Sequence, residues 1–133
     1  MEYTLSGLLP KELLIDLPEI DVQHEEIFRR IEMLKSSSFG SKPTSLGEFH
    51  SLLDYLEWHF ASEERVARQL GVDFADHARI HDENLRTLRK ALAAVQDGSQ
   101  DVHSFLRYTE YWFERHISDE DKPFAARLRA RTV

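Results

Sequence analysis

Apolar residues recur every three or four positions through most of the chain, the spacing expected on one face of an α-helix. These runs predict four long helices, at about residues 18–35, 45–70, 73–96 and 99–119. Short breaks rich in Ser, Gly or Pro separate them, at 36–44, 71–73 and 97–99. A short fifth helix is predicted at about 122–131, because Pro123 suits its first turn. No segment convincingly predicts a strand.

Together these elements predict an all-α protein, an up-down-up-down four-helix bundle, because short connections make consecutive helices antiparallel neighbours. A chain of 133 residues suits a single domain with one core. We divide it into an N-terminal arm (about 1–17), the bundle (about 18–119) and the short terminal helix (about 122–131). The arm is apolar enough to pack across the bundle, since it contains Leu13, Leu14, Ile15 and Leu17. Ser45 and Glu48 have capping-box spacing where the second helix should begin.

Six ionisable side chains interrupt the apolar faces of the four helices instead of lying on the solvated faces. They are His24 on the first helix, His59 and Glu63 on the second, His77 and His81 on the third, and His116 on the fourth. A spacing of four residues places each of the two pairs on one helix face. Burying an unpaired imidazole or carboxylate is costly. A metal shared by all four helices would remove that cost.

A seventh candidate is Asp121, which lies five residues after His116. Five residues turn about 140° around a regular α-helix. Both side chains can therefore point inward only if the fourth helix ends or loosens between them. Pro123 favours an ending there. Asp119 competes with Asp121 as the last inward carboxylate.

Seven ligands are too many for one ion, since zinc usually takes about four and iron about six. Two metals with bridging carboxylates fit the number, and imidazole with carboxylate suits iron. Alone, a His on an apolar face is more often a hydrogen-bonded core residue. That simpler explanation weakens when it must hold on four helices at once. We expect His50 and His103 to be surface or boundary residues, and four aromatic residues to be core and rim rather than redox relays: Tyr55, Trp58, Tyr108 and Trp112.

The order of the candidate segments resembles the hemerythrins, in particular the single-domain bacteriohemerythrins. The segments are Ile20-Asp21-Val22-Gln23-His24, His59-Phe60-Ala61-Ser62-Glu63-Glu64, His77-Ala78-Arg79-Ile80-His81 and His116-Ile117-Ser118-Asp119-Glu120-Asp121. The resemblance covers about residues 15–124, and the combination of four motifs in this order is highly specific. One departure is Asp16, at a place where the family commonly has a Gly.

The resemblance implies a role for each of the seven residues. His77, His81 and His116 would hold one iron, and His24 and His59 the other, leaving it one open position. Glu63 and Asp121 would bridge the two irons beside an oxo or hydroxo bridge. The implied activity is reversible binding of O₂ at the open iron, where small anions could also bind, for oxygen storage, delivery or buffering. By position, Ile27, Phe60, Trp112 and Ile117 match the apolar lining of the family's oxygen pocket.

Two other functions are compatible with such a centre. One is a sensor in which O₂ or redox state changes the activity of a partner. The other is a diiron oxidase, peroxidase or nitric-oxide-handling protein, although we expect a carrier rather than an enzyme. Ferritin-like diiron enzymes use Glu-x-x-His pairs, and no His in this chain has a Glu three residues before it.

Composition limits the partners, the kinds of metal site and the cellular locations that we expect. The net charge of −7 disfavours nucleic acid or an anionic membrane surface as a partner. The absence of cysteine excludes disulfides, thiolate zinc sites and iron–sulfur clusters, and it fits a cytoplasmic location. No apolar run approaches the roughly 20 residues of a membrane-spanning helix, and Met1 is not followed by a signal-peptide pattern. No protein partner is indicated.

Overall fold

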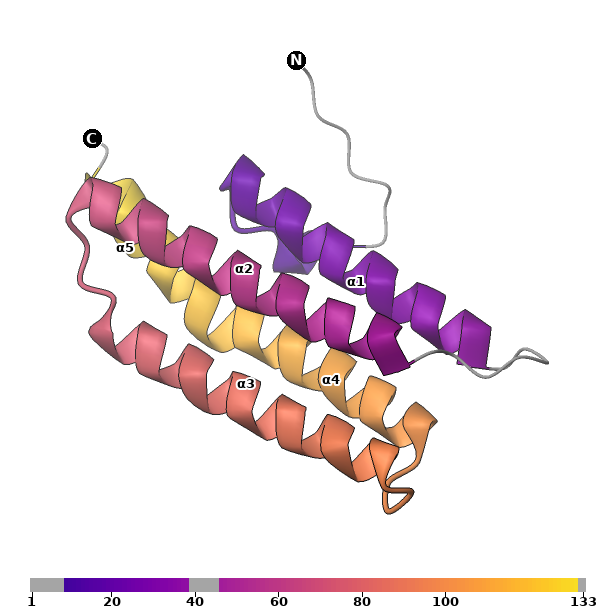
Figure 1. Cartoon of the computed structure of the whole chain (residues 1–133). Helices are drawn as coiled ribbons and strands as arrows, with labels where there is room; N and C mark the ends of the chain where they lie inside the picture. The colour runs from indigo at the N-terminus through magenta and orange to yellow at the C-terminus, as the bar shows by residue number, and fades with distance from the viewer. Residues whose placement is uncertain (1–8, 39–45, 132–133) are drawn as a thin grey trace.

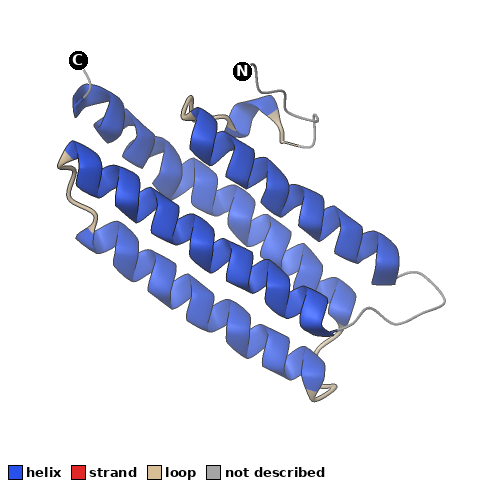
Figure 2. Cartoon of the chain, turned by 45° about the horizontal axis from the view of Figure 1, so that its top comes forward, coloured by secondary structure: helices blue, strands red, loops and turns tan. Residues whose placement is uncertain are grey.

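The computed structural model describes residues 9–38 and 46–131. It contains the helices η1 (Lys11–Leu13), α1 (Pro18–Ser38), α2 (Leu46–Leu70), α3 (Ala75–Gln96), α4 (Val102–His116) and α5 (Lys122–Arg131), with a π-helical turn, η2 (Ile117–Asp121), between the last two. The described residues include no strand, and short loops join the described helices from α2 onward (Figure 2). The predicted all-α class is therefore confirmed.

The four long helices form an antiparallel bundle (Figure 1). Helices α1 and α3 each pack against both α2 and α4. Helix α5 continues the direction of α4 and lies beside the C-terminal part of α2. The Arg131 side chain fastens this end of the bundle, because it donates hydrogen bonds to the carbonyl oxygens of Leu70 (3.3 Å) and Gly71 (3.2 Å). No described helix is both long and apolar enough to cross a bilayer.

Three helix ends differ from those expected, besides the end of α4, which is described with the metal centre. Helix α1 continues three residues past 35, to Ser38. Helix α3 begins at Ala75 instead of 73, and Asp73 caps it from outside by accepting a hydrogen bond from the Ala75 N–H (3.1 Å). The proposed Ser45 cap of α2 lies outside the described residues.

The start of α4 is the third difference, at Val102 instead of about 99. Gly98 has a φ of 82°, which turns the chain out of α3. Ser99 still bonds back to that helix, since its N–H donates to the Ala94 carbonyl (2.9 Å). Asp101 is the true cap, because its carboxylate accepts from the Ser104 N–H (2.9 Å).

The described part of the N-terminal arm packs on the bundle as expected, with Leu9, Leu13 and Ile15 buried. Asp16 has a φ of 60°, the left-handed region that glycine adopts freely and aspartate tolerates better than most residues. Asp16 can therefore occupy this turn without a glycine. Across this turn, the Ile15 N–H donates a hydrogen bond to the Asp21 carboxylate (3.0 Å), which joins the arm to the first turn of α1.

Two apolar clusters hold the bundle together. The larger extends along most of its length and includes Ile27, Leu53, Leu88, Phe105 and Phe113, each at most 1% exposed. Each such side chain contributes roughly 1.5–3 kcal/mol relative to an exposed one. The smaller cluster lies toward the α2–α3 connection and contains Ala67, Phe74, Phe124 and Leu128. The polar residues singled out above contact both clusters.

Candidate metal centre

All seven candidate ligands are buried, with exposed fractions between 0% and 5%. They come from every long helix and from the π-helical turn: His24 from α1, His59 and Glu63 from α2, His77 and His81 from α3, His116 from α4 and Asp121 from η2. The packing of the helices brings these side chains to one place in the interior of the bundle.

The cluster divides into two groups, and within each group the potential ligand atoms all lie within 4.8 Å of one another. One group is His77, His81, His116 and Asp121, and the other is His24, His59, Glu63 and Asp121. Asp121 belongs to both. The arrangement therefore offers two adjacent metal positions, one with three imidazoles and one with two.

Each carboxylate directs one oxygen toward each set of histidines. Glu63 places Oε2 at 2.6 Å from His59 Nε2, while its Oε1 is 3.3 Å from His77 Nε2 and 3.8 Å from His81 Nε2. This is the arrangement required of a carboxylate that bridges two ions.

Asp121 likewise directs one carboxylate oxygen toward each set of histidines. Its Oδ1 is 3.2 Å from His77 Nε2 and 3.3 Å from His116 Nε2, and its Oδ2 is 3.1 Å from His24 Nε2. Every one of these histidines presents Nε2, so the side chains converge through equivalent ring atoms.

Several buried atoms of the cluster have no hydrogen-bond partner among the described residues. They are His24 Nδ1 and Nε2, His59 Nε2, both carboxylate oxygens of Glu63, His116 Nδ1 and Asp121 Oδ2. Each such atom costs about 1–3 kcal/mol when left unsatisfied. Metal ions are the partners that this set of nitrogen and oxygen atoms fits.

The carboxylates of the centre are ionised. Burial and Asp121 raise the pKa of Glu63, but His59 and His77 outweigh them and hold it at about 2. Burial also raises the pKa of Asp121, and the surrounding histidines, His116 foremost, keep it well below its ordinary value. Both side chains are therefore anionic oxygen donors at neutral pH, as a cation site requires.

Two histidines of the three-imidazole group differ in basicity. Burial lowers the pKa of His77, but its contacts with Asp121 and Glu63 prevail and raise it to about 9. Burial lowers the pKa of His81 to about 3. His81 therefore presents a neutral imidazole, whereas His77 has a proton to lose before it can act as a ligand.

The π-helical turn explains how His116 and Asp121 both face inward. Hydrogen bonds between residues five apart make a wider turn, and the Lys122 N–H accordingly donates to the Ile117 carbonyl. Pro123 has no N–H, and in a regular α-helix its ring would clash with the Asp119 carbonyl. Of the two possibilities that the spacing left open, an end or a loosening of the helix, the structure shows the loosening, since the chain stays helical through 117–121. The ending that Pro123 favoured is not found.

Gln23 is a residue of the site that its sequence position alone did not identify. Its side chain is buried, and its Oε1 accepts a hydrogen bond from His59 Nδ1 at 2.6 Å. A proton on Nδ1 leaves the Nε2 lone pair free to face the centre. The two residues are 36 apart in sequence, so no spacing rule links them.

Replacing Gln23 with leucine should weaken iron binding at the His24–His59 group by about 10- to 100-fold, the usual effect of removing a hydrogen-bond partner of a metal ligand. Leucine keeps the bulk of the side chain and removes the acceptor. Competition titration against a chelator measures the affinity. Gln23→Glu retains an acceptor oxygen and should bind nearly as tightly as wild type, and Gln69→Leu on the exposed face of α2 is the control. Unchanged affinity in Gln23→Leu would remove Gln23 from this role.

Aromatic rings surround the histidines. Phe60 stacks on His81 with ring centroids 3.8 Å apart, and Trp112 stacks on His116 at 5.3 Å. Phe74 stacks on His77 at 4.8 Å, from the smaller apolar cluster. These stacked rings restrict the orientation of the three imidazoles.

The four residues expected to line an oxygen pocket all belong to, or pack against, the larger apolar cluster. Phe60 and Trp112 are in edge contact at 6.4 Å, and Ile27 and Ile117 are fully buried in the same apolar cluster. Trp112 is half-buried, so it connects this lining with the surface.

The residues expected to lie outside the centre do so. His50 is exposed and hydrogen-bonded to Gln96, and His103 is half-buried in the first turn of α4. Asp119 is exposed and forms an ion pair with Arg115 at 3.2 Å, so Asp121 is the carboxylate that points inward. Among the aromatic residues treated as core and rim, Trp58 and Tyr108 are exposed.

Comparison with known proteins adds one finding. The family model described as hemerythrin HHE cation-binding domain matches residues 16–128, which includes all seven residues of the centre. No curated protein matches the chain.

Proposed function

The chain belongs to the hemerythrin HHE cation-binding domain family, and on this premise we propose that it holds two non-haem iron ions and binds O₂ reversibly. The observation that carries the proposal is the pair of carboxylates, Glu63 and Asp121, each with one oxygen toward each set of histidines. One metal would need no such bridge.

The choice of iron follows from the donor atoms. Five imidazoles and two carboxylates are donors that divalent iron accepts readily, and the described groups contain no thiolate. His77, His81 and His116 with the bridging carboxylates would nearly complete one coordination sphere. His24 and His59 would leave the second ion a position for an exogenous ligand. When bound, a diiron centre of this kind would supply the two electrons that O₂ takes up on binding, and would recover them when O₂ leaves.

The chain's own residues would make that binding reversible. Ile27, Phe60, Trp112 and Ile117, which are apolar and belong to or pack against the larger cluster, would form a surround from which water and protons are largely excluded. Glu63 and Asp121 would compensate the positive charge of the ions inside the bundle. Gln23 holds His59 in one tautomer, so that the ring nitrogen facing the centre stays unprotonated. An apolar surround of this kind slows irreversible oxidation by excluding solvent.

Exposure of the anaerobically reduced, iron-loaded protein to O₂ should produce a visible absorption band. We expect the band to disappear on removal of O₂ and to return on re-exposure, at constant iron content. Protein loaded with zinc in place of iron is the matched control and should show no band. Conversion in one step to a stable oxidised form, with hydrogen peroxide released, would contradict reversible binding and favour an oxidase.

A further inference from the structure

A solvent-open cleft between α2 and α3 reaches the three-histidine group. Its volume is about 180 Å³, and His81 is among the residues that line it. Phe60 and Phe74 flank the imidazole, at ring-centroid distances of 3.8 Å and 5.6 Å. His81 thus lies between the cleft and the buried carboxylates.

The exposed fractions of the seven candidate ligands also indicate that solvent reaches the centre through the three-histidine group. His77, His81 and His116 retain exposed fractions of 5%, 3% and 2%. His24, His59, Glu63 and Asp121 have none. What little contact the candidate ligands have with solvent therefore belongs to the three-histidine group.

The cleft has an acidic rim. Glu57 and Glu64 from α2 and Asp82 from α3 line it, and no lysine or arginine does. Arg89 approaches Glu57 at 3.2 Å and Arg68 approaches Glu64 at 3.6 Å, which offsets part of the charge. Asp82 has no ion pair with any described residue. The rim is therefore negative, and it lies on a chain that is itself negative overall.

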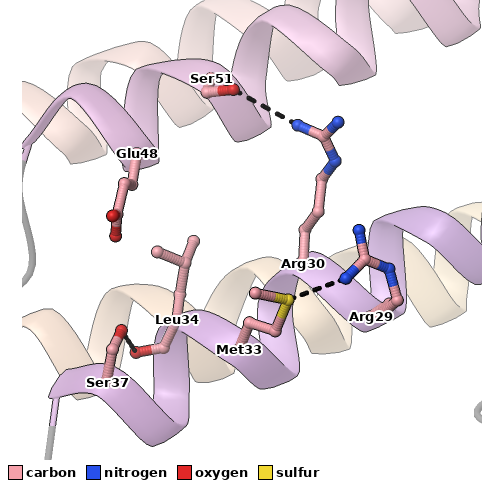
Figure 3. A pocket seen from close by; sticks show the side chains of 7 residues that line it. All are labelled: Arg29, Arg30, Met33, Leu34, Ser37, Glu48 and Ser51. Atoms are coloured by element: carbon pink, nitrogen blue, oxygen red, sulfur yellow. Dashed lines mark hydrogen bonds between the residues drawn. The ribbon is translucent and has the colours of Figure 1, made fainter.

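Two other hollows in the described structure lack these features. Both lie on the C-terminal part of α1, and Arg29 lines both. One of the two, shown in Figure 3, also has Arg30, which donates a hydrogen bond to Ser51 at 3.3 Å. Neither hollow contains a residue of the metal groups. Arg29 is itself paired with Glu26 at 2.6 Å, and Glu48 lines one hollow and Glu32 the other. The α2–α3 cleft differs from both because it is lined by a residue of the metal groups and by no arginine or lysine.

We infer that the α2–α3 cleft is the route by which Fe²⁺ enters the metal-free protein, with the acidic rim concentrating the cation and His81 as its first ligand in the centre. This inference rests on the proposed diiron centre. Two small side chains keep the route open, since Ala61 of α2 and Ala78 of α3 line the cleft between the two helices. Oriented negative charge at a narrow entrance raises the local concentration of a cation and the rate at which it enters.

Iron uptake by metal-free protein tests the route. Anaerobic protein is mixed with Fe²⁺, and a strong chelator added at set times separates free from bound iron. In the rim variant, with Glu57→Gln, Glu64→Gln and Asp82→Asn, uptake should slow by roughly 10-fold at low ionic strength. The difference should shrink in 1 M salt, where the screening length falls to about 3 Å. The final iron content should equal that of wild type.

A steric variant tests the same route without changing charge. Ala61 is exposed on α2, so Ala61→Trp should be accommodated while its ring fills much of the cleft, and uptake should again slow. The control for charge is Glu12→Gln with Glu32→Gln and Glu48→Gln, which makes the same change in net charge elsewhere. Ala93→Trp, at an exposed position of α3, is the control for bulk.

Slow uptake in both the rim and the steric variant, with both controls close to wild type, supports the route. Uptake in either variant at the rate of its control overturns it, while two irons bound at equilibrium leave the proposed centre intact. Wild-type protein that takes up no iron would refute the centre itself. Circular dichroism of each variant shows that the bundle is retained.

Discussion

Replacing Asp121 with alanine should reduce the iron content from two ions per chain to fewer than one. Asp121 is the residue shared by both metal groups, with Oδ1 toward His77 and His116 and Oδ2 toward His24. Its loss removes a donor from both positions at once. Loss of a group that only orients a ligand already lowers metal affinity by about 10- to 100-fold, so loss of a bridging ligand should exceed that range.

Iron per chain is measured by elemental analysis after reconstitution and desalting. The control is Asp119→Ala, which removes a carboxylate two residues away that is exposed and paired with Arg115, and it should retain both ions. Metal-free Asp121→Ala should remain helical, because neither apolar cluster includes Asp121. Two irons bound by Asp121→Ala at wild-type affinity would show that Asp121 does not bridge.

Each bound iron should raise the melting temperature by roughly 12–20 °C when free iron is about a thousandfold above its dissociation constant. At that ratio a ligand that binds only the folded state stabilises it by about 4 kcal/mol, and for a domain of this size each kcal/mol shifts the midpoint by about 3–5 °C. The physical source is the set of unsatisfied buried atoms, such as His24 Nε2 and both oxygens of Glu63.

Thermal unfolding followed by circular dichroism, with and without Fe²⁺ under anaerobic conditions, measures this effect. The shift should be large for wild type and for Asp119→Ala, and nearly absent for Asp121→Ala. A metal-free protein that melts at the same temperature as the iron-loaded one would mean that these buried atoms do not bind metal in the folded state.

Much of the fold was predictable because its determinants are local. The periodic apolar positions of α1 and α2 predicted helices whose ends lie within three residues of those observed. The start of α4 was missed because Ser99 and Asp101 are both cap residues by type. Only the backbone shows that Ser99 still bonds to Ala94 in α3.

Part of the candidate site was also predictable from local spacing. Helical periodicity alone places His59 and Glu63 on one face of α2, and likewise His77 and His81 on α3, so their inward direction needs no knowledge of the other helices. Asp121 was chosen over Asp119 by resemblance, whereas the reason it points inward is the wider turn imposed before Pro123. Gln23 and the acidic cleft were not predicted, since each depends on contacts between helices.

The sequence by itself determined that this protein is a helical bundle with imidazoles and carboxylates turned toward its core. It did so because an α-helix relates residues three and four apart, and both the apolar stripes and the polar interruptions follow that spacing. Only the tertiary structure decided which oxygen of Glu63 and Asp121 faces which histidines, that the bundle opens toward His81, and that Gln23 orients His59. Those relations join side chains on different helices, and their distances are set by how the helices pack.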